Sequence, residues 1–295
     1  MEELKFEAIE LPLWGKIVGI LLNLLVVVLN SIEIHILRTT VKKRFYESIL
    51  LSLTVSDLIN GLFGFSAVAL LSFFGKKSYY LLFWIIGGYG LSYSALISLM
   101  HLIFISLDRL WAVHSPLHHM QYSSKRKRII ALVPSWGIPI TCMLASMIFV
   151  LFHKLSRESV LLHLENTIYC TVAKAILFAD LIFIFAYSVI IWITFSRKTE
   201  NIQENQKQRG RFSNTLILCM SIVLIFILST TPFTISFLFN WSRPGWFATL
   251  GNVLFTVNAI SNSLVFLIQK YRTQRSTLRS MNGRDVSSNS YDTRL

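Results

Sequence analysis

Seven runs of mostly apolar residues recur along this chain, and each is long enough to cross a membrane as a helix. A helix needs about 20 apolar residues to span roughly 30 Å of hydrocarbon. The runs occupy residues 13–37, 47–73, 80–109, 129–152, 168–195, 212–240 and 246–269. No stretch between them is long enough for a separate globular domain. Only 15% of all residues are charged, well below the usual share in soluble domains.

The length of these runs favours helices over strands. A membrane-spanning strand needs only about 10 residues of alternating character, and these runs are longer and uniformly apolar. A helix also satisfies its own backbone hydrogen bonds, which lipid cannot do. The sequence therefore predicts an all-α membrane protein. Its seven-helix bundle would occupy residues 13–269, between an amino-terminal tail, 1–12, and a carboxyl-terminal tail, 270–295.

Positive charge is divided unevenly between alternate connecting segments. Twenty Lys and Arg residues fall in residues 38–46, 109–128, 197–211 and 270–295, whereas six fall in the segments on the other side. Cationic segments stay cytoplasmic, so we expect a multi-pass plasma-membrane protein whose amino terminus is outside and whose carboxyl terminus is inside. This placement accounts for the net charge of +13 without a nucleic-acid partner.

Each apolar run carries polar or proline residues of the kind that mark function, because polar groups in lipid are costly. They are Asn30, Asp57, Asp108, Arg109, Trp136, Tyr187, Pro232, Asn258 and Asn262. Asn30 and Asp57 lie 27 positions apart, as do Arg109 and Trp136. The third run ends in DRLWAVHSPL, residues 108–117.

This pattern resembles the rhodopsin-like (class A) G-protein-coupled receptors from end to end. DRLWAVHSPL is similar to the family's Asp-Arg-Tyr-x-x-Val-x-x-Pro-Leu, with Leu110 in place of Tyr. The resemblance implies a non-enzymatic receptor in which Asp108 holds Arg109 at rest. Arg109 meets a heterotrimeric G protein when the sixth helix, residues 212–240, moves outward; helices 1 to 7 are the seven runs in chain order. The activation residues that it implies are Asp108, Arg109, Val113, Pro116, Leu117, Tyr187, Phe226, Pro232 and Asn262.

The resemblance also implies a sodium pocket near the middle of the bundle. Asp57, Ser98, Asn258 and Asn262 supply hard oxygen atoms, which suit a small hard cation. A buried carboxylate without a cation or a proton is very costly. Sodium at Asp57 and a protonated, merely hydrogen-bonded Asp57 therefore both remain open, and no other cofactor is expected.

The outer cavity that the resemblance implies is apolar with a few hydroxyls and amides. Its lining would be Leu91, Ser92, Ala95, Thr171, Phe233, Phe237, Asn252 and Thr256. Amine receptors have an acid at the place of Leu91, and retinal proteins have a lysine at the place of Thr256. The lining therefore argues against an amine or a covalent chromophore, and it suits a lipid, a small neutral molecule or the apolar tip of a peptide.

Several positions depart from the family pattern. Thr230 replaces the helix-6 tryptophan, and Ser263 and Phe266 replace the proline and tyrosine of the helix-7 motif. Ala179 stands for the helix-5 proline and Trp84 for the helix-3 cysteine. The last two losses are shared with the melanocortin branch and some lipid-receptor branches, and the branch stays open.

Two smaller expectations concern charged residues. The base of helix 6, residues 207–214 (KQRGRFSN), is basic where many relatives have an acid that restrains the arginine. Raised basal activity is the resulting hypothesis. In helix 5, Asp180 is expected to bond to His101 of helix 3.

The carboxyl-terminal tail has three predicted uses. Residues 270–280 would form a short amphipathic eighth helix on the membrane surface. The polar end should be disordered and accessible to a receptor kinase and arrestin. Thr293 and Leu295 fit a PDZ-domain ligand. Asn240 begins the one glycosylation sequon.

Other classes of membrane protein make different predictions. A transporter or channel would show paired broken segments, and the chain has no such symmetry. An intramembrane enzyme would need a nucleophile and a base at suitable spacing, which is also not found. A receptor-like protein with impaired signalling remains an alternative, because the helix-6 and helix-7 motifs are altered.

Overall fold

The computed structural model describes residues 13–39, 45–73, 87, 89–115, 118–119, 125–152, 170–198, 206–238 and 253–272, and this part of the chain is helical. The long helices are α1 (Leu13–Arg38), α2 (Phe45–Phe73), α4 (Leu91–His114), α6 (Lys125–Phe152), α8 (Cys170–Lys198), α9 (Gln206–Leu238) and a last helix, Val253–Arg272. The predicted all-α bundle of seven helices is confirmed.

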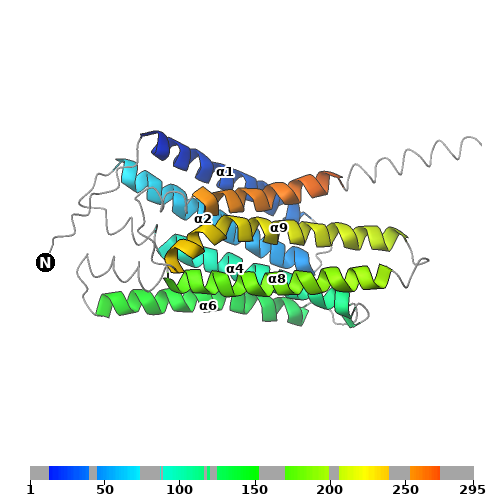
Figure 1. Ribbon diagram of the computed structural model, residues 1–295. Coiled ribbons are helices and arrows are strands. Elements are labelled where there is room, and N and C mark those ends of the chain that lie inside the picture. Colours follow the sequence, from blue (N-terminus) through cyan, green and yellow to red (C-terminus); the bar gives the residue numbers. More distant parts are fainter. Residues whose placement is uncertain are drawn as a thin grey trace, which may run out of the picture.

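The helices lie side by side along a common direction, with α4 in the interior (Figure 1). Helix α4 packs against α2, α6, α8 and α9, and α1 packs mainly against α2. The main hydrophobic core follows α4, where Leu102 contributes a fully buried side chain alongside Phe183 of α8 and Phe226 of α9. The last helix returns to α1, where Val26, Ala259 and Ile260 form a second, smaller core. The first and the last helix of the bundle are thereby in contact.

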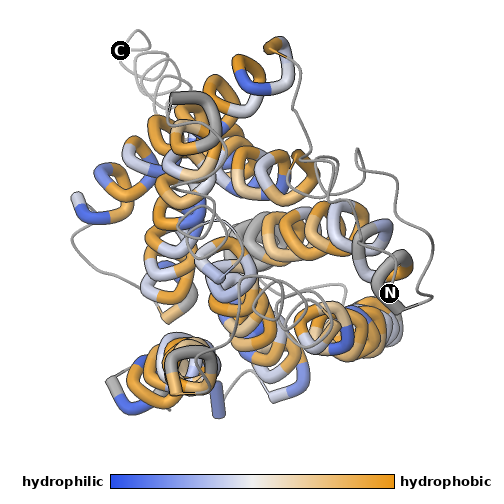
Figure 2. Tube along the Cα trace, turned by 90° about the vertical axis from the view of Figure 1, so that its left-hand side faces the viewer, coloured by the Kyte–Doolittle hydropathy of each residue, from blue (hydrophilic) through white to orange (hydrophobic). Residues whose placement is uncertain are grey.

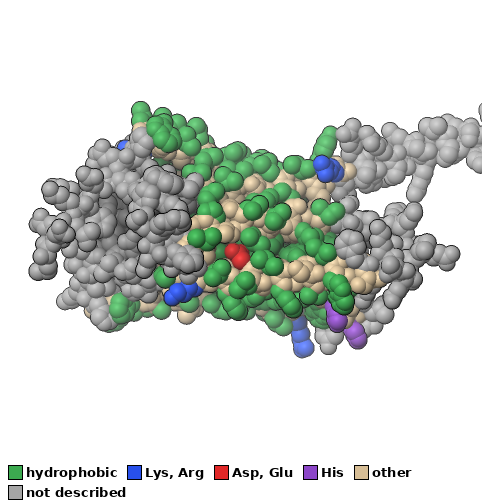
Figure 3. Space-filling view, viewed as in Figure 1, with side chains coloured by type: hydrophobic (Ala, Val, Ile, Leu, Met, Phe, Trp, Pro, Cys, Tyr) green, Lys and Arg blue, Asp and Glu red, His purple; other side chains and the backbone are tan. Residues whose placement is uncertain are grey.

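The outer surface of the bundle is apolar. Six of the helices are long and apolar enough to cross a membrane, and α9 contains a shorter apolar stretch, Leu216–Pro232. Large hydrophobic side chains such as Ile130, Phe178 and Trp192 are mostly exposed. Hydrophobic residues run the length of the helices (Figure 2) and cover most of the described face in Figure 3. Soluble monomeric proteins rarely expose an apolar surface this extensive, and surrounding lipid would cover it along the full length of the helices.

Helix ends differ from the predicted runs by several residues. Helix α4 continues to His114 instead of ending at Arg109, α6 begins at Lys125 rather than 129, and α9 begins at Gln206 rather than 212. The predicted start of the third run, residues 80–86, lies outside the described residues. Hydropathy marks the part of a helix that lipid contacts, whereas backbone hydrogen bonding continues into polar residues beyond it.

Two glycines allow α1 and α2 to approach closely. A Cβ added at Gly61 would lie 2.7 Å from Cγ1 of Val26, and one added at Gly64 would overlap the side-chain amide of Asn23. Small residues let membrane helices pack backbone to backbone, because lipid supplies no hydrophobic force between them. This contact fixes α1 against α2 beside the polar residues described below.

Candidate functional site

A buried ion pair lies near the end of α4. Arg109 donates through Nη2 to Oδ2 of Asp108, and both residues are almost inaccessible to solvent. The imidazole of His119 donates through Nε2 to Oδ1 of the same carboxylate at 2.8 Å. A buried charge is tolerated when it is paired and hydrogen-bonded. Asp108 therefore holds Arg109 in place, and loss of that contact would release a cation.

The chain beyond α4 positions His119. The backbone N–H of Ser115 donates to the carbonyl of Trp111 at 2.9 Å, and that of His119 donates to the carbonyl of Ser115 at 2.9 Å. Each bond joins residues four positions apart, and together they link His119 to the last turn of α4 through Ser115. The imidazole then contacts the Trp111 indole edge to face, with ring centroids 5.9 Å apart. Pro116 and Leu117, which lie between them, are outside the described residues.

Four more of the predicted activation residues lie on α4, α8 and α9, and Asn262 lies on the last helix. Val113 is buried one turn beyond Arg109. On α8, the buried Tyr187 accepts a long hydrogen bond from Ser106 at 3.5 Å. Phe226 of α9 packs edge to face on Phe183 of α8, with centroids 6.2 Å apart. Pro232 lies within α9 on an exposed face.

A polar cluster surrounds Asp57 in the middle of α2. Ser98 of α4 donates to Oδ1 of Asp57 at 2.9 Å, and Asn262 of the last helix donates to Oδ2 at 3.1 Å. Ser56 extends the network, with its hydroxyl 2.9 Å from that of Ser98. Asn258 lies one turn before Asn262, and the side-chain Oδ1 atoms of both are buried and have no hydrogen-bond partner among the described residues. The buried carboxyl of Asp57 thus has two neutral donors, and the last helix carries two buried amide oxygens that no described residue satisfies.

A second polar contact joins α1 to the last helix. Ser263 donates to Oδ1 of Asn30 at 3.0 Å, while Asn30 donates through Nδ2 to the carbonyl of Val26 at 2.8 Å. The buried carboxyl of Glu33 lies beside the hydroxyls of Ser263 and Thr54. Ser263 follows Asn262 directly, so neighbouring residues of the last helix bond to α1 and α2.

Ser52 of α2 is a third polar junction. Its hydroxyl accepts from Nε1 of Trp136 at 2.7 Å and lies 2.8 Å from Nε2 of His101. The other ring nitrogen of His101 contacts the carbonyl of Ile97 at 2.7 Å. The expected bond between His101 and Asp180 is therefore wrong, because both ring nitrogens have other partners. One hydroxyl joins α2, α4 and α6.

Residues 22–266 match the family model for 7 transmembrane receptors of the rhodopsin family. The chain belongs to this family. It is therefore a multi-pass membrane protein and a G-protein-coupled receptor, and receptors of this family are not enzymes. Family membership also sets aside the transporter and channel alternatives.

The predicted ligand residues of the receptor are only partly described. Leu91 begins α4, and Ser92 and Ala95 are buried just after it. Thr171 is exposed near the start of α8, and Thr256 is partly buried in the last helix. The side chains of Phe233 and Phe237, on α9, and all of Asn252 lie outside the described residues.

Three further predictions for the receptor fall outside the described residues: Asn240, Trp84, and Thr293 with Leu295 of the tail. Of the predicted eighth helix, residues 270–280, the first three residues belong to the last described helix, which ends at Arg272. The remaining residues, 273–280, lie outside the described part of the chain.

Three contacts in the receptor were missed from the sequence. His119 was not singled out, because its neighbour His118 looks the same in the sequence and only the turn after α4 decides which ring reaches Asp108. Ser52 was overlooked as one of several serines in α2. Ser263 was noted only as a lost proline, although its hydroxyl forms the contact with Asn30.

Proposed function

We propose that this receptor binds a non-amine ligand at its extracellular end and activates a heterotrimeric G protein at its cytoplasmic end, through release of Arg109 from Asp108. The observation that carries the proposal is the buried Asp108–Arg109 pair near the end of α4. A carboxylate bound to both Arg109 and His119 stabilises the resting arrangement. Any movement that separates these groups exposes a guanidinium that can bind carbonyl and carboxylate oxygens of a partner.

The distribution of Lys and Arg supports the orientation. With cationic segments on the cytoplasmic side, the Asp108–Arg109 pair faces the G protein and the start of α4 faces the ligand. In this orientation the residues after 270 are cytoplasmic. We assign arrestin and receptor kinase to this tail, and a PDZ-domain protein to Thr293 and Leu295.

The ligand class follows from the residues at the outer end. Leu91, Ser92 and Ala95 offer apolar surface and one hydroxyl, with no carboxylate for an ammonium group. Thr171 and Thr256 add hydroxyls, Asn252 an amide, and Phe233 and Phe237 aromatic surface. A pocket of this character suits a lipid, a small neutral molecule or the apolar end of a peptide.

A sodium ion fits the Asp57 cluster. Asp57 supplies negative charge, Ser98 a hydroxyl oxygen, and Asn258 and Asn262 two buried amide oxygens that receive no hydrogen bond within the described part of the chain. An oxygen without a donor is costly when buried, and a hard cation would satisfy it. When bound, sodium would supply positive charge that offsets the Asp57 carboxylate.

Ligand-free nucleotide exchange tests the proposal, because it requires no knowledge of the ligand. Each G-protein subtype is expressed with the receptor, with Arg109→Ala, and with Arg126→Ala, which removes an exposed arginine in α6. We expect exchange on at least one subtype, its loss in Arg109→Ala, and its retention in Arg126→Ala at equal surface expression. Undiminished exchange in Arg109→Ala would overturn the proposed role of that residue. Absence of exchange on every subtype would favour a receptor with impaired signalling.

A further inference from the structure

A crevice opens on the side of the bundle between α2 and α6. It has a volume of about 410 Å³ and is lined by Ser48, Leu51, Ser52, Val55, Arg128 and Leu132. Residues spaced three or four apart share one face of a helix, so Ser48, Ser52 and Val55 line the α2 wall and Arg128 and Leu132 the α6 wall. The volume is within the range of about 300–1,000 Å³ typical of ligand sites.

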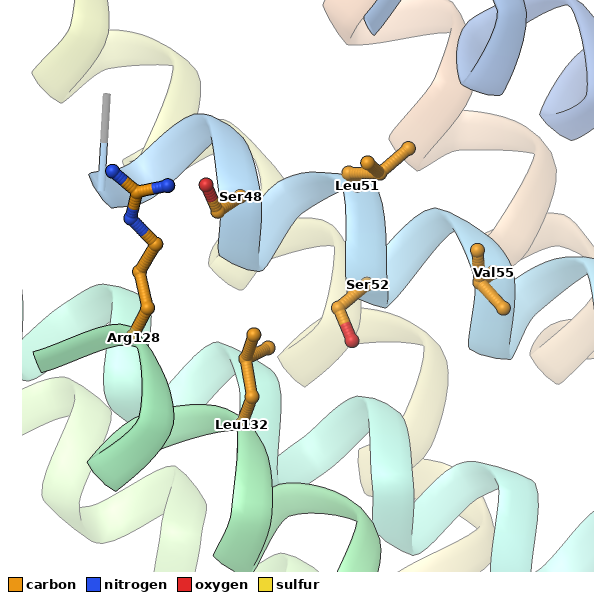
Figure 4. Close-up of a pocket in the computed structure, with 6 residues that line it drawn as sticks. All are labelled: Ser48, Leu51, Ser52, Val55, Arg128 and Leu132. Atoms are coloured by element: carbon orange, nitrogen blue, oxygen red, sulfur yellow. The ribbon is translucent and has the colours of Figure 1, made fainter. Parts of the chain in front are cut away.

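The two ends of this crevice differ chemically. Figure 4 shows the guanidinium of Arg128 reaching toward Ser48, at the opposite end from Val55, with Leu132 between them. One end therefore offers a cation beside a hydroxyl, and the rest offers mainly apolar surface. A molecule with an anionic head and an apolar chain matches both ends.

Arg128 has an unsatisfied donor in the described structure. Its Nε–H is buried and has no hydrogen-bond partner among the described residues. A buried donor without an acceptor is costly. Arg128 also closes a run of four bases, residues 125–128, at the amino-terminal end of α6. That end of a helix carries partial positive charge, so bases there are unfavourable unless an anion is near.

The residues next to Arg128 place the crevice at the height of the lipid tails. Ile129, Ile130 and Val133 of α6 are all more than half exposed, and only 17% of the most apolar part of this helix is buried. The crevice therefore opens toward lipid, whereas Arg128 belongs to the basic end of the helix. The boundary between acyl chains and headgroups falls within it.

We propose that the crevice between α2 and α6 binds an anionic phospholipid of the cytoplasmic leaflet, whose phosphate contacts Arg128 and Ser48 and whose acyl chain lies along Val55 and Leu132. The choice of leaflet rests on the orientation proposed above, which places the amino-terminal end of α6 inside. Guanidinium groups bind phosphate in a bidentate geometry. The cytoplasmic leaflet carries the anionic lipids, so the charge of the site and its surroundings agree.

Occupancy of this crevice would reach the interior of the receptor through Ser52. This residue lines the crevice, and its hydroxyl also holds Trp136 and His101. A lipid that packs against Ser52 supports the junction of α2, α4 and α6. Binding to the folded state alone raises stability by mass action, so the lipid should also raise the unfolding temperature.

Lipid binding to the purified, delipidated full-length receptor tests this inference. The readout is native mass spectrometry of bound phosphatidylglycerol, phosphatidylcholine or a sterol, with thermal unfolding as a second measurement. The variants are Arg128→Gln, the conservative Arg128→Lys, and the matched control Arg126→Gln, which removes a nearby exposed charge. Leu132→Phe fills the apolar part of the crevice without changing charge.

We expect Arg128→Gln to weaken phosphatidylglycerol binding about tenfold, the loss of one charge-assisted contact, and to abolish the preference over phosphatidylcholine. Arg126→Gln should retain the preference, Arg128→Lys should retain part of it, and Leu132→Phe should weaken both phospholipids. Inorganic phosphate at matched ionic strength should not displace the lipid, because it lacks the acyl chain.

Three results would overturn the inference. Equal losses in Arg126→Gln and Arg128→Gln would indicate diffuse attraction to the basic run. Displacement of the phospholipid by a sterol that binds Arg128→Gln normally would assign the crevice to the sterol. Full displacement by inorganic phosphate would leave an anion site without a lipid. If Arg128→Gln does not fold, unchanged phospholipid binding in Leu132→Phe contradicts the inference by itself.

Discussion

His119 and Asp108 are joined by a hydrogen bond of 2.8 Å from the imidazole Nε2 to the carboxylate Oδ1. Asp108 therefore has two cationic or donating partners, Arg109 from its own helix and His119 from the turn that follows. The imidazole is itself fixed by its contact with Trp111. The turn after α4 thus takes part in holding the Asp108–Arg109 pair.

Replacement of His119 by Ala should raise basal nucleotide exchange. The variant removes one of two donors to Asp108, so the carboxylate holds Arg109 in a less constrained geometry. A hydrogen bond to a charged group contributes about 1.5 kcal/mol, which corresponds to an increase of up to about tenfold. The matched control is His118→Ala, since the neighbouring ring is exposed. Equal exchange in both variants would show that the His119 contact is not a restraint.

Sodium should stabilise the receptor through Asp57. Thermal unfolding in sodium chloride is compared with choline chloride at the same ionic strength. At ten times its dissociation constant, a ligand of the folded state adds about 1.4 kcal/mol, and Asp57→Asn should remove this increment. Asp180→Asn is the control, because this buried acid lies on α8, away from the Asp57 cluster. A sodium-insensitive receptor would instead support a protonated Asp57.

Substitution of Gly61 should destabilise the receptor, whereas the same change at Gly137 should not. A Cβ at Gly61 would lie 2.7 Å from Val26, and one at Gly137 would meet nothing within 4 Å. Overpacking of this kind costs about 1–3 kcal/mol, while Ala in place of an exposed helical Gly is favourable by up to about 1 kcal/mol. The unfolding temperatures of Gly61→Ala and Gly137→Ala should therefore move in opposite directions. A shift in the same direction would mean that α1 and α2 are not closely packed at Gly61.

Loss of the Ser263 hydroxyl should loosen the last helix from α1. Ser263→Ala removes the bond to Asn30, and hydrogen bonds between membrane helices contribute about 0.6 kcal/mol on average. Ser31→Ala is the control, because among the described residues that exposed hydroxyl bonds to the carbonyl of Val27 in its own helix. Thermal unfolding should show a decrease for Ser263→Ala alone. Equal unfolding temperatures would mean that the contact with Asn30 adds no stability.

The architecture could be predicted because lipid imposes a strict rule on the sequence. A membrane helix needs a long apolar run, so the sequence alone predicted the helices that contain Asn30 and Tyr187. The juxtaposition of Asp57, Ser98 and Asn262 was expected from the family pattern, and the three side chains are in contact. Both kinds of prediction rest on features that are uniform along a helix or shared by a family.

Contacts that depend on local geometry could not be predicted. His119 reaches Asp108 because the turn after α4 closes on Ser115, and nothing in the sequence distinguishes it from His118. The predicted bond between His101 and Asp180 relied on the pairing of an imidazole with a carboxylate. It overlooked Ser52, whose hydroxyl lies within hydrogen-bond distance of His101. In a bundle, helix rotation decides such contacts, and apolar runs with polar residues on several faces leave the rotation open.

Ser263, described above as a partner of Asn30, also leaves the last helix without a proline. Every residue from Val253 to Arg272 has a backbone N–H, so no hydrogen bond inside this helix is lost to proline and no proline kink forms. We therefore expect this helix to move as one rigid body during signalling. A shift of its cytoplasmic end would then tilt or rotate the whole helix, and the extracellular end would move as well.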